Sequence, residues 1–489
     1  MKPASKICLA LTFISLISNV FADGEEGTNE TTPSYDIAND EGEENKTTSS
    51  SQSRCSGMMG RTLYKEYGSA MHRQREQSEL SPSEWMTTLL FHRILIPLTA
   101  DEYCSLLDYF TDCDTGLNTE DTAQKIPNQS NSEKGNPDKP SLSCKLGKLP
   151  KSNFLLKGTT FASFAALEDN NNTFLAALNP IFMWRYGTSI LYEMELEIAL
   201  DAGETHIGME YGNLNYLLND YLTIRGGKFL LPLGFWKEKM HPEWINKLPT
   251  PPLPYANEDH TVIPPSDLGL DLRGAVPVGT FGGRLDVPMV LVYDFWVANG
   301  PDEVDGDILL NGTNYNDNNN NKSLGARLSF RPWPYREFGI SGMKAQWNNN
   351  THGGDVSSSQ KLYYTALVAD TDLHFGDYFR VCGEFMWTKK DMPKDEANPN
   401  QGDVTTRAFW AQASSTCLEQ TNVKYIENIE MVVRYGLINT TGQQRNQRQW
   451  SFGLNYYLTN KMLFKAGYDL NWGDDNKNDL FSIQWAYGY

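Results

Sequence analysis

Residues 461–472 read KMLFKAGYDLNW and alternate between two kinds of side chain. One face carries Met462, Phe464, Ala466, Tyr468, Leu470 and Trp472, and the other carries Lys465, Gly467, Asp469 and Asn471. This period of two is that of a β-strand, whose successive side chains point to opposite faces. The apolar face continues for about ten residues, the length that a tilted strand needs to cross a bilayer.

The same alternation begins near residue 158 and continues to the end of the chain. It is clear at residues 190–200, 324–330 and 450–458, where large apolar side chains again hold one face. We expect about 16 strands of this kind, and they start near residues 160, 173, 188, 205, 219, 267, 283, 323, 338, 361, 378, 404, 422, 449, 461 and 480. A soluble β-sandwich also alternates, so the period alone leaves two fold classes open.

The lengths of the connections separate these two classes. Those after odd-numbered strands are often long and polar, and examples are residues 299–322, 348–360, 389–403 and 439–448. Those after even-numbered strands are mostly short, as at residues 185–187, 376–377 and 459–460. Short periplasmic turns opposite long extracellular loops are typical of bacterial outer-membrane barrels. We therefore predict an all-β fold, a transmembrane antiparallel β-barrel with both termini in the periplasm.

The last residues of the chain agree with this fold. Phe481, Ile483, Trp485, Tyr487 and Tyr489 form one apolar face, and Ser482, Gln484, Ala486 and Gly488 lie opposite. An amphipathic final strand that ends in an aromatic residue resembles the insertion signal of bacterial outer-membrane proteins. The alternative is an ordinary strand that happens to end the chain.

The N-terminal third has a different composition. Lys2, Lys6, an apolar run and small residues before Asp23 predict a cleaved signal peptide over residues 1–22. Residues 23–54 are acidic and polar, which predicts a disordered leader. Residues 55–153 contain two capping-box patterns and a polar linker, which predict a small helical, disulfide-containing periplasmic region that could alternatively plug the barrel. The barrel itself is expected over residues 154–489.

Six cysteines remain after the signal peptide, and an even number in an exported chain favours disulfides. Cys104 and Cys113 are candidates to join the two short helices, and Cys382 and Cys417 are candidates within the barrel, although the sequence leaves the connectivity open. No C-x-x-C or H-E-x-x-H is present, so we predict neither a metal site nor a cofactor. The formal net charge of −19 argues against a nucleic-acid partner.

One segment is similar to a known family. The stretch RGGKFLLPLG at residues 225–234 leads into HPEWINKLP at residues 241–249. It resembles the strand and long loop of porins of the phosphate-selective and carbohydrate-selective (OprB-like) families. The resemblance covers about 50 residues and implies a 16-stranded barrel, often trimeric, in which loops fold inward to narrow the channel.

The loop over residues 235–266 also has a physical interpretation of its own. It holds seven prolines, which stiffen the chain, and Trp244 and Tyr255 offer apolar anchors. A stiff loop can define the diameter of a pore. The alternative is an external loop packed on its neighbours or on another subunit. The candidate constriction residues are His241, Pro242, Trp244, Lys247, Pro249, Tyr255 and His260.

The inward faces of the expected strands carry charges of both signs. The candidate pore-lining residues are Glu193, Glu195, Glu197, Arg225, Arg327, Arg331, Arg380, Glu384, Glu430, Arg434 and Lys465. As a set they argue for a wet interior, because unpaired charges do not sit in a dry one. Taken one by one, each could instead form a structural ion pair in the barrel wall. The basic ladder of phosphate-selective channels is not present.

These features together predict a porin in the bacterial outer membrane that lets small hydrophilic solutes and ions diffuse passively, with weak cation preference. The expected partners are outer-membrane lipid and lipopolysaccharide, the barrel-assembly machinery and two further copies in a homo-trimer. The alternative is a plugged, structural or adhesive barrel. A barrel enzyme is disfavoured, because none of the five histidines of the barrel region lies in a recognisable catalytic motif. The N-x-S/T matches at Asn29, Asn45, Asn128, Asn311 and Asn439 leave a secreted eukaryotic glycoprotein as a third class.

Overall fold

The computed structural model describes most of the chain from residue 152 onward. The described residues are 152–167, 172–201, 204–256, 261–280, 288–303, 310–311, 319, 321–333, 336–348, 361–376, 378–393, 402–421, 423–441, 445–473 and 478–489. The predicted signal peptide, leader and N-terminal region fall outside this part of the chain, apart from residues 152–153, and so do Cys104 and Cys113.

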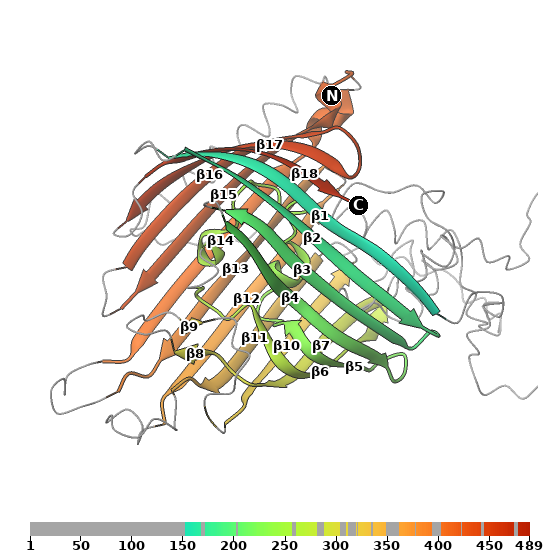
Figure 1. The fold of residues 1–489 in the computed structure, drawn as a ribbon, viewed down its shortest axis with the longest axis vertical. Coiled ribbons are helices and arrows are strands. Elements are labelled where there is room, and N and C mark those ends of the chain that lie inside the picture. Colours follow the sequence, from blue (N-terminus) through green and yellow to red (C-terminus); the bar gives the residue numbers. More distant parts are fainter. Residues whose placement is uncertain are drawn as a thin grey trace, which may run out of the picture. The chain divides into compact units, whose positions relative to one another are not determined.

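Sixteen antiparallel strands close into one barrel (Figure 1). They are β1 (Ser152–Leu167), β2 (Asn172–Tyr186), β3 (Ile190–Asp201), β4 (Glu204–Leu217), β5 (Thr223–Leu230), β6 (Ser266–Thr280), β7 (Pro288–Ala298), β10 (Ser323–Trp333), β11 (Arg336–Gln346), β12 (Tyr363–Phe375), β13 (Phe379–Lys390), β14 (Val404–Ser415), β15 (Ile429–Thr440), β16 (Arg445–Tyr457), β17 (Met462–Gly473) and β18 (Leu480–Gly488). Each strand pairs with its neighbours in the barrel, and β8 (Asp302–Glu303) pairs only with β9 (Leu310–Asn311). The predicted fold class and strand number are confirmed.

The barrel closes between its first and last strands. β1 pairs with β18 from Thr159 opposite Gly488 to Leu167 opposite Leu480. Beyond the strand, the backbone N–H of Tyr489 donates to the carbonyl of Gly158 at 3.0 Å, and that of Gly158 donates back at 3.2 Å. The final strand therefore joins the two ends of the sheet and leaves it without an open edge.

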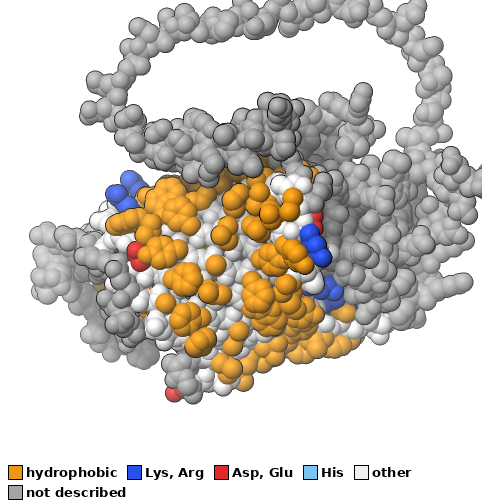
Figure 2. Space-filling view, turned by 90° about the horizontal axis from the view of Figure 1, so that it is seen from above, with side chains coloured by type: hydrophobic (Ala, Val, Ile, Leu, Met, Phe, Trp, Pro, Cys, Tyr) orange, Lys and Arg blue, Asp and Glu red, His pale blue; other side chains and the backbone are white. Residues whose placement is uncertain are grey.

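The alternation that predicted the strands sorts the side chains as expected. In β17, Phe464, Tyr468 and Trp472 are exposed, whereas Lys465 and Asp469 are buried. Figure 2 shows apolar side chains across one outer face of the barrel, with charged side chains near its borders. An apolar exterior and a polar interior are what a membrane-spanning barrel requires. No helix among the described residues is long and apolar enough to cross a membrane.

Two connections differ from the predicted lengths. The one at residues 439–448 is short, because β15 continues to Thr440 and β16 begins at Arg445. Pairing of Asn439 with Asn446 continues the ladder, so this polar run is strand rather than loop. The connection between β14 and β15 is longer than predicted and contains the 3-10 helices η5 (Cys417–Thr421) and η6 (Ile426–Asn428).

The closure predicts a specific role for the terminal aromatic residues. The ring of Tyr487 lies beside that of Tyr489, with centroids 6.1 Å apart and the planes tilted by 31°, where β18 meets β1. Replacing both with serine removes apolar anchors from the closing strand. We expect a lower yield of folded barrel on refolding into detergent micelles, measured by heat-modifiable migration on gels. Tyr221→Ser, in an exposed turn, is the control, and an unchanged yield of the double variant would contradict the role.

Candidate constriction loop

A 35-residue connection, residues 231–265, joins β5 to β6 and folds into the barrel. It contains the short helix α5 (Trp236–Lys239) and the 3-10 helix η3 (Leu253–Tyr255). Most of its described residues are buried, and they contact inward-facing side chains on strands across the barrel. We call this segment the inner loop. The expectation that the loop lies inside the barrel is therefore met, and His260 falls outside the described residues.

Glu384 on β13 is the central attachment point of the inner loop. Its Oε1 accepts the backbone N–H groups of Phe235, at 2.6 Å, and Trp236, at 2.9 Å. Its Oε2 accepts the hydroxyl of Tyr255 at 2.7 Å, and Trp410 Nε1 at 2.9 Å. Three of these donors belong to the loop, Phe235 and Trp236 near its start and Tyr255 in its second half, and the fourth belongs to β14 of the wall. One buried carboxylate therefore holds both halves of the loop.

A glycine permits this close approach. Gly234 has φ +74°, a conformation that side chains with a Cβ rarely adopt. A Cβ there would also overlap the Glu384 carboxylate. The Gly234 N–H donates to Ser341 Oγ at 3.0 Å.

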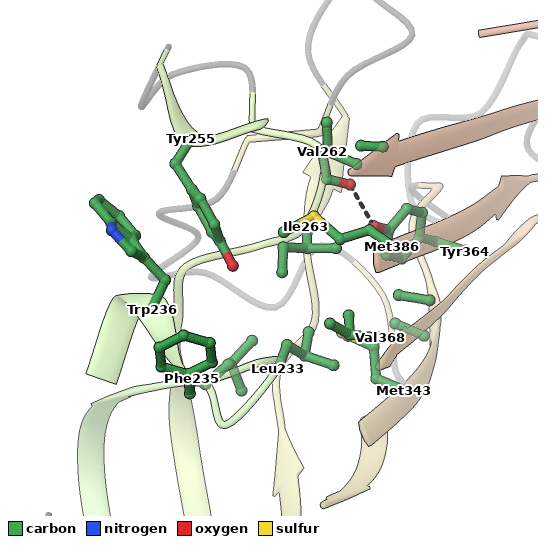
Figure 3. Close-up of a cluster of buried hydrophobic side chains, with 14 of the residues drawn as sticks. Leu233, Phe235, Trp236, Tyr255, Val262, Ile263, Met343, Tyr364, Val368 and Met386 are labelled. Carbon is green, nitrogen blue, oxygen red and sulfur yellow. Dashed lines mark hydrogen bonds between the residues drawn. The ribbon is translucent and has the colours of Figure 1, made fainter. Parts of the chain in front are cut away.

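An apolar seam seals the loop against β11–β13. Figure 3 shows Leu233, Phe235, Trp236, Tyr255, Val262 and Ile263 of the loop facing Met343, Tyr364, Val368 and Met386 of the wall. Trp236 and Tyr255 stack with centroids 4.6 Å apart, and the Tyr364 hydroxyl donates to the Val262 carbonyl at 2.7 Å. Burial of this many apolar groups makes the loop part of the core of the protein.

The opposite side of the loop packs against a row of glycines on the barrel wall. Four successive strands, β15 to β18, each present one glycine beneath one loop side chain. The pairs are Gly436 with Leu253, Gly453 with Leu248, Gly467 with Pro249, and Gly488 with Trp244. A Cβ on Gly467 would lie 2.8 Å from Pro249 Cδ, closer than side chains normally approach. The loop can lie against this wall only because these positions have no side chains.

Polar groups of the same wall bind the loop backbone. Arg434 Nη2 donates to the carbonyls of Thr250, at 3.0 Å, and Pro251, at 2.8 Å. Lys465 Nζ donates to the carbonyl of Glu243, and Asn455 Nδ2 donates to that of Lys247 at 2.9 Å. These wall groups satisfy loop carbonyls that have no partner in a regular element.

Helix α5 faces a third sector of the wall. Lys237 pairs with Glu210 at 2.7 Å, and Lys239 pairs with Glu337 at 2.7 Å. Glu238 bridges Arg225, at 3.2 Å, and Arg273, at 3.1 Å.

Two loop groups have shifted pKa values. Burial disfavours the charge of Glu238, but Arg273 and Arg225 more than offset this and lower the pKa of its carboxyl. His241 lies 3.7 Å from Glu195. Burial opposes its charge, but this carboxylate raises the pKa of the imidazole above its ordinary value.

All eleven candidate pore-lining residues lie on inward-facing strand positions. Ten are buried and Glu197 is half-buried. Glu384, Arg434 and Lys465 contact the loop, as do Glu430, which is 3.3 Å from Lys247, and Glu195. Arg327 pairs with Asp370, Arg380 with Asp372, and Arg225 with Asp271. The structural pairing considered for single residues is therefore present, and a role in lining a channel stays a prediction.

The candidate constriction residues lie along the contact between the inner loop and the barrel wall. Lys247 and Tyr255 are buried, whereas His241, Pro242, Trp244 and Pro249 are half-buried. Sequence reasoning missed the glycine row and the partners Asp271, Arg273, Asp294 and Asp370. The alternation could have found the last four, because they occupy the inward positions of β6, β7 and β12.

The predicted pair of Cys382 and Cys417 is wrong for this structure, since both thiols are free. Cys382 faces inward on β13, where Gln412 lies opposite. Cys417 follows β14 and lies next to the start of β13, because Thr416 N–H donates to the Tyr378 carbonyl. The two cysteines are therefore separated by four residues along the strand direction, about 13 Å. This distance exceeds the separation of Cα atoms that a disulfide can bridge. Among the described residues, no group of three His, Cys, Asp or Glu could hold a metal ion.

Fold and loop together define the class of this protein, a closed 16-stranded antiparallel barrel with an inward-folded loop. Similar solved structures include the outer-membrane protein OmpT of Vibrio cholerae with loop L8 deleted, at 10% identity, 70% of this chain, 100% of that chain and TM-score 0.46. An anion-selective porin from Comamonas acidovorans matches at 12% identity, and the match covers 69% of this chain and 100% of that chain with a TM-score of 0.43. OmpF of Salmonella typhi, in complex with daunomycin, matches at 12% identity, and the match covers 69% of this chain and 98% of that chain with a TM-score of 0.45.

Likeness at this level concerns the fold and nothing finer. No family model matches the chain, and no curated protein matches it either. The narrower resemblance of residues 225–249 to phosphate-selective and carbohydrate-selective porins therefore stays a prediction.

The Glu384 attachment can be tested by two replacements. Leucine leaves four buried donors unpaired, and one such group costs about 1–3 kcal/mol. We expect Glu384→Leu to lower the free energy of unfolding in detergent micelles by about 3 kcal/mol or more. Glu384→Gln keeps one accepting oxygen and should lose less. Equal stability of the leucine variant and the wild type would show that the loop is held elsewhere.

The glycine row makes a separate prediction. Gly467→Val places a branched side chain against the rigid ring of Pro249, and such overpacking costs about 1–3 kcal/mol. We expect lower thermal stability and faster protease cleavage within residues 241–250. Gly208→Val in β4 is the matched control, because a Cβ there meets nothing within 4 Å. If both valine variants behave alike, the row does not seat the loop.

Proposed function

We propose that this protein is a porin of the bacterial outer membrane, through which small hydrophilic solutes and ions diffuse passively. The observation that carries this proposal is the inner loop, which lies inside a 16-stranded barrel and contacts three sectors of its wall. A barrel of this size encloses more space than its own side chains fill. A loop fixed in that space sets the width of whatever path remains.

The burial of the wall supports a narrow path. Ten of the eleven candidate lining residues are excluded from water by the loop or by their neighbours. Two stretches of the loop are half-exposed, residues 241–244 and residues 249–251, and the first of them lies beside β3 and β18. We propose that solutes pass residues 241–244 and that the path is weakly cation-selective, since Glu243 belongs to this stretch and Glu195 lies 3.7 Å from His241.

The same burial favours a second candidate, a plugged or structural barrel without an open channel. In that case the loop would close the lumen completely at rest. Neither candidate involves catalysis, and we propose that the protein is not an enzyme.

The remaining proposals concern export and assembly. We propose that residues 1–22 are removed on export, that residues 23–54 form a leader, and that residues 55–153 stay in the periplasm. The barrel-assembly machinery would recognise the final strand, and lipid and lipopolysaccharide would surround the barrel. We further propose a homo-trimer.

A loop replacement tests the channel directly. Leu230 and Ser266 are opposite each other in the β5–β6 ladder, and Leu231 N–H donates to the Pro265 carbonyl at 3.0 Å. A short Gly-Ser turn can therefore replace residues 233–263 without straining the barrel. We expect a several-fold rise in single-channel conductance in a planar bilayer, because conductance grows with the open cross-section.

Removal of residues 23–150 is the companion experiment, and we expect it to leave conductance nearly unchanged. The opposite result, with conductance rising only after that removal, would identify the N-terminal region as a plug. Absence of conductance in wild type together with its appearance in the loop variant would establish the plugged alternative.

A further inference from the structure

One sector of the lumen wall carries acids without strongly basic partners. Elsewhere the inward carboxylates are paired, as Asp271 is with Arg225 at 2.9 Å. Around Glu195 of β3, the described residues place one basic group within 4 Å, the imidazole of His241 in the inner loop, at 3.7 Å. Glu243 of the loop likewise has a buried oxygen that no described residue binds. This sector therefore differs in charge from the rest of the lumen.

Four buried oxygens of the same sector have no hydrogen-bond partner among the described residues. They are Thr159 Oγ1, Asn179 Oδ1, Glu195 Oε2 and Glu243 Oε2. Thr159 and Glu195 are each 1% exposed, and Asn179 is 8% exposed. Buried polar atoms are nearly always satisfied by protein, water or a ligand, so four of them together indicate a molecule that donates to them. We call these four residues the acceptor cluster.

Strand pairing brings the wall part of the cluster together. Thr159 of β1 lies opposite Asn179 of β2 on one side and Gly488 of β18 on the other. Trp244 of the inner loop lies against Gly488, because a Cβ there would be 2.6 Å from its ring. Glu195 of β3 lies opposite the inward residue of β2 that follows Asn179. The wall part of the cluster thus occupies three adjacent strands, next to the place where the loop meets β18.

The loop stretch 241–244 completes the cluster. Its first residue, His241, lies beside Glu195, and Glu243 is two residues further along. Burial raises the pKa of the Glu243 carboxyl, and the nearby Glu195 carboxylate raises it further, although Lys465 and His241 oppose this. A bound cation would relieve the repulsion between the two acids.

The wall beside the cluster is apolar and half-exposed toward the end of the barrel where the inner loop enters. Phe161 and Ala165 of β1, Leu175 of β2 and Ala199 of β3 face inward there. Phe161 and Trp244 pack against the same apolar residues, so the loop and the wall meet at this level. A solute that reaches the acceptor cluster from this side therefore contacts an apolar surface next to the acidic one.

We propose that the acceptor cluster is a subsite for primary alkylammonium solutes. A primary ammonium group carries one charge and three N–H donors, which match two carboxylates and two neutral oxygens. Trp244 offers a ring face to the same cation, and the half-exposed apolar side chains lie next to its alkyl chain. The inference rests on the proposed porin function, because it names the class of solute that the path favours.

Three other ligand classes fit this sector less well. An anion would be repelled by Glu195 and Glu243. A quaternary ammonium ion carries the charge but has no N–H to donate, so it would leave the four oxygens unsatisfied. A metal ion is disfavoured, because no group of three His, Cys, Asp or Glu among the described residues could hold one.

Three probes of four carbon atoms each test the subsite, namely n-butylammonium, tetramethylammonium and 1-butanol. We expect the full-length folded protein in neutral detergent to bind n-butylammonium several-fold more tightly than the other two, measured by isothermal titration calorimetry. E195Q/E243Q should weaken this binding about tenfold or more, because it removes both charges of the subsite. E419Q/E427Q is the matched control, which removes two acids from the connection between β14 and β15 and should retain wild-type affinity.

Thr159→Val separates ligand binding from structure. Valine has the shape of threonine without the hydroxyl, and that hydroxyl has no partner among the described residues. The variant should keep or gain thermal stability, because it removes a buried unsatisfied group. It should nevertheless bind n-butylammonium several-fold more weakly, and unchanged affinity would count against the subsite. This variant also carries the test if E195Q/E243Q does not fold.

Two further outcomes would overturn the proposal, equal loss in the control variant and equal affinity for tetramethylammonium or 1-butanol. Conductance of the wild type in potassium chloride is recorded separately, so that the two proposals are read independently. Conductance without preferential binding of n-butylammonium overturns the subsite alone. Binding that depends on the acceptor cluster but comes without conductance supports the subsite and overturns the porin proposal.

Discussion

A ring of 16 strands satisfies the backbone hydrogen bonds of its wall, but it encloses more space than its own inward side chains fill. Everything inside this barrel follows from that mismatch. The 35-residue inner loop enters the lumen and supplies the missing contacts. Because a loop carries many unpaired backbone groups, it can stay there only if the wall provides donors and acceptors. Glu384, Arg434 and Lys465 provide them.

The wall meets this need differently on its different sectors. On β11–β13 the loop packs through apolar side chains around Tyr364 and Met386. On β15–β18 the wall has glycines instead, so the loop backbone approaches closely enough for Arg434 and Asn455 to reach its carbonyls. The three charged residues of helix α5, Lys237, Glu238 and Lys239, are held by ion pairs with the wall. Apolar contact, close backbone approach and ion pairing each fix one part of the loop, so the loop follows a fixed course through the lumen.

The strands of the barrel could be predicted from the sequence, because a period of two over ten or more residues indicates a strand, and the alternating lengths of the connections then favoured a barrel over a sandwich. The site could be predicted only in part. Glu384 was found by its inward position, but its task was not, since four donors from sequence-distant segments define it. The glycine row was missed because a glycine leaves no mark on an alternating pattern. The predicted disulfide between Cys382 and Cys417 was wrong because an even number of cysteines says nothing about how far apart two of them lie along the strands.

One consequence of the alternation connects the two faces of the wall. Neighbouring residues of a strand point to opposite faces, so Ala408 is buried against the core of the barrel while Arg407 is exposed on its outer face. Met343 and Lys344 divide in the same way on β11. A shift of one residue in the register of either strand would turn the cation toward the interior and the apolar side chain toward the outer face. The contacts of the inner loop and the outward position of these two cations are therefore fixed by the same strand pairing.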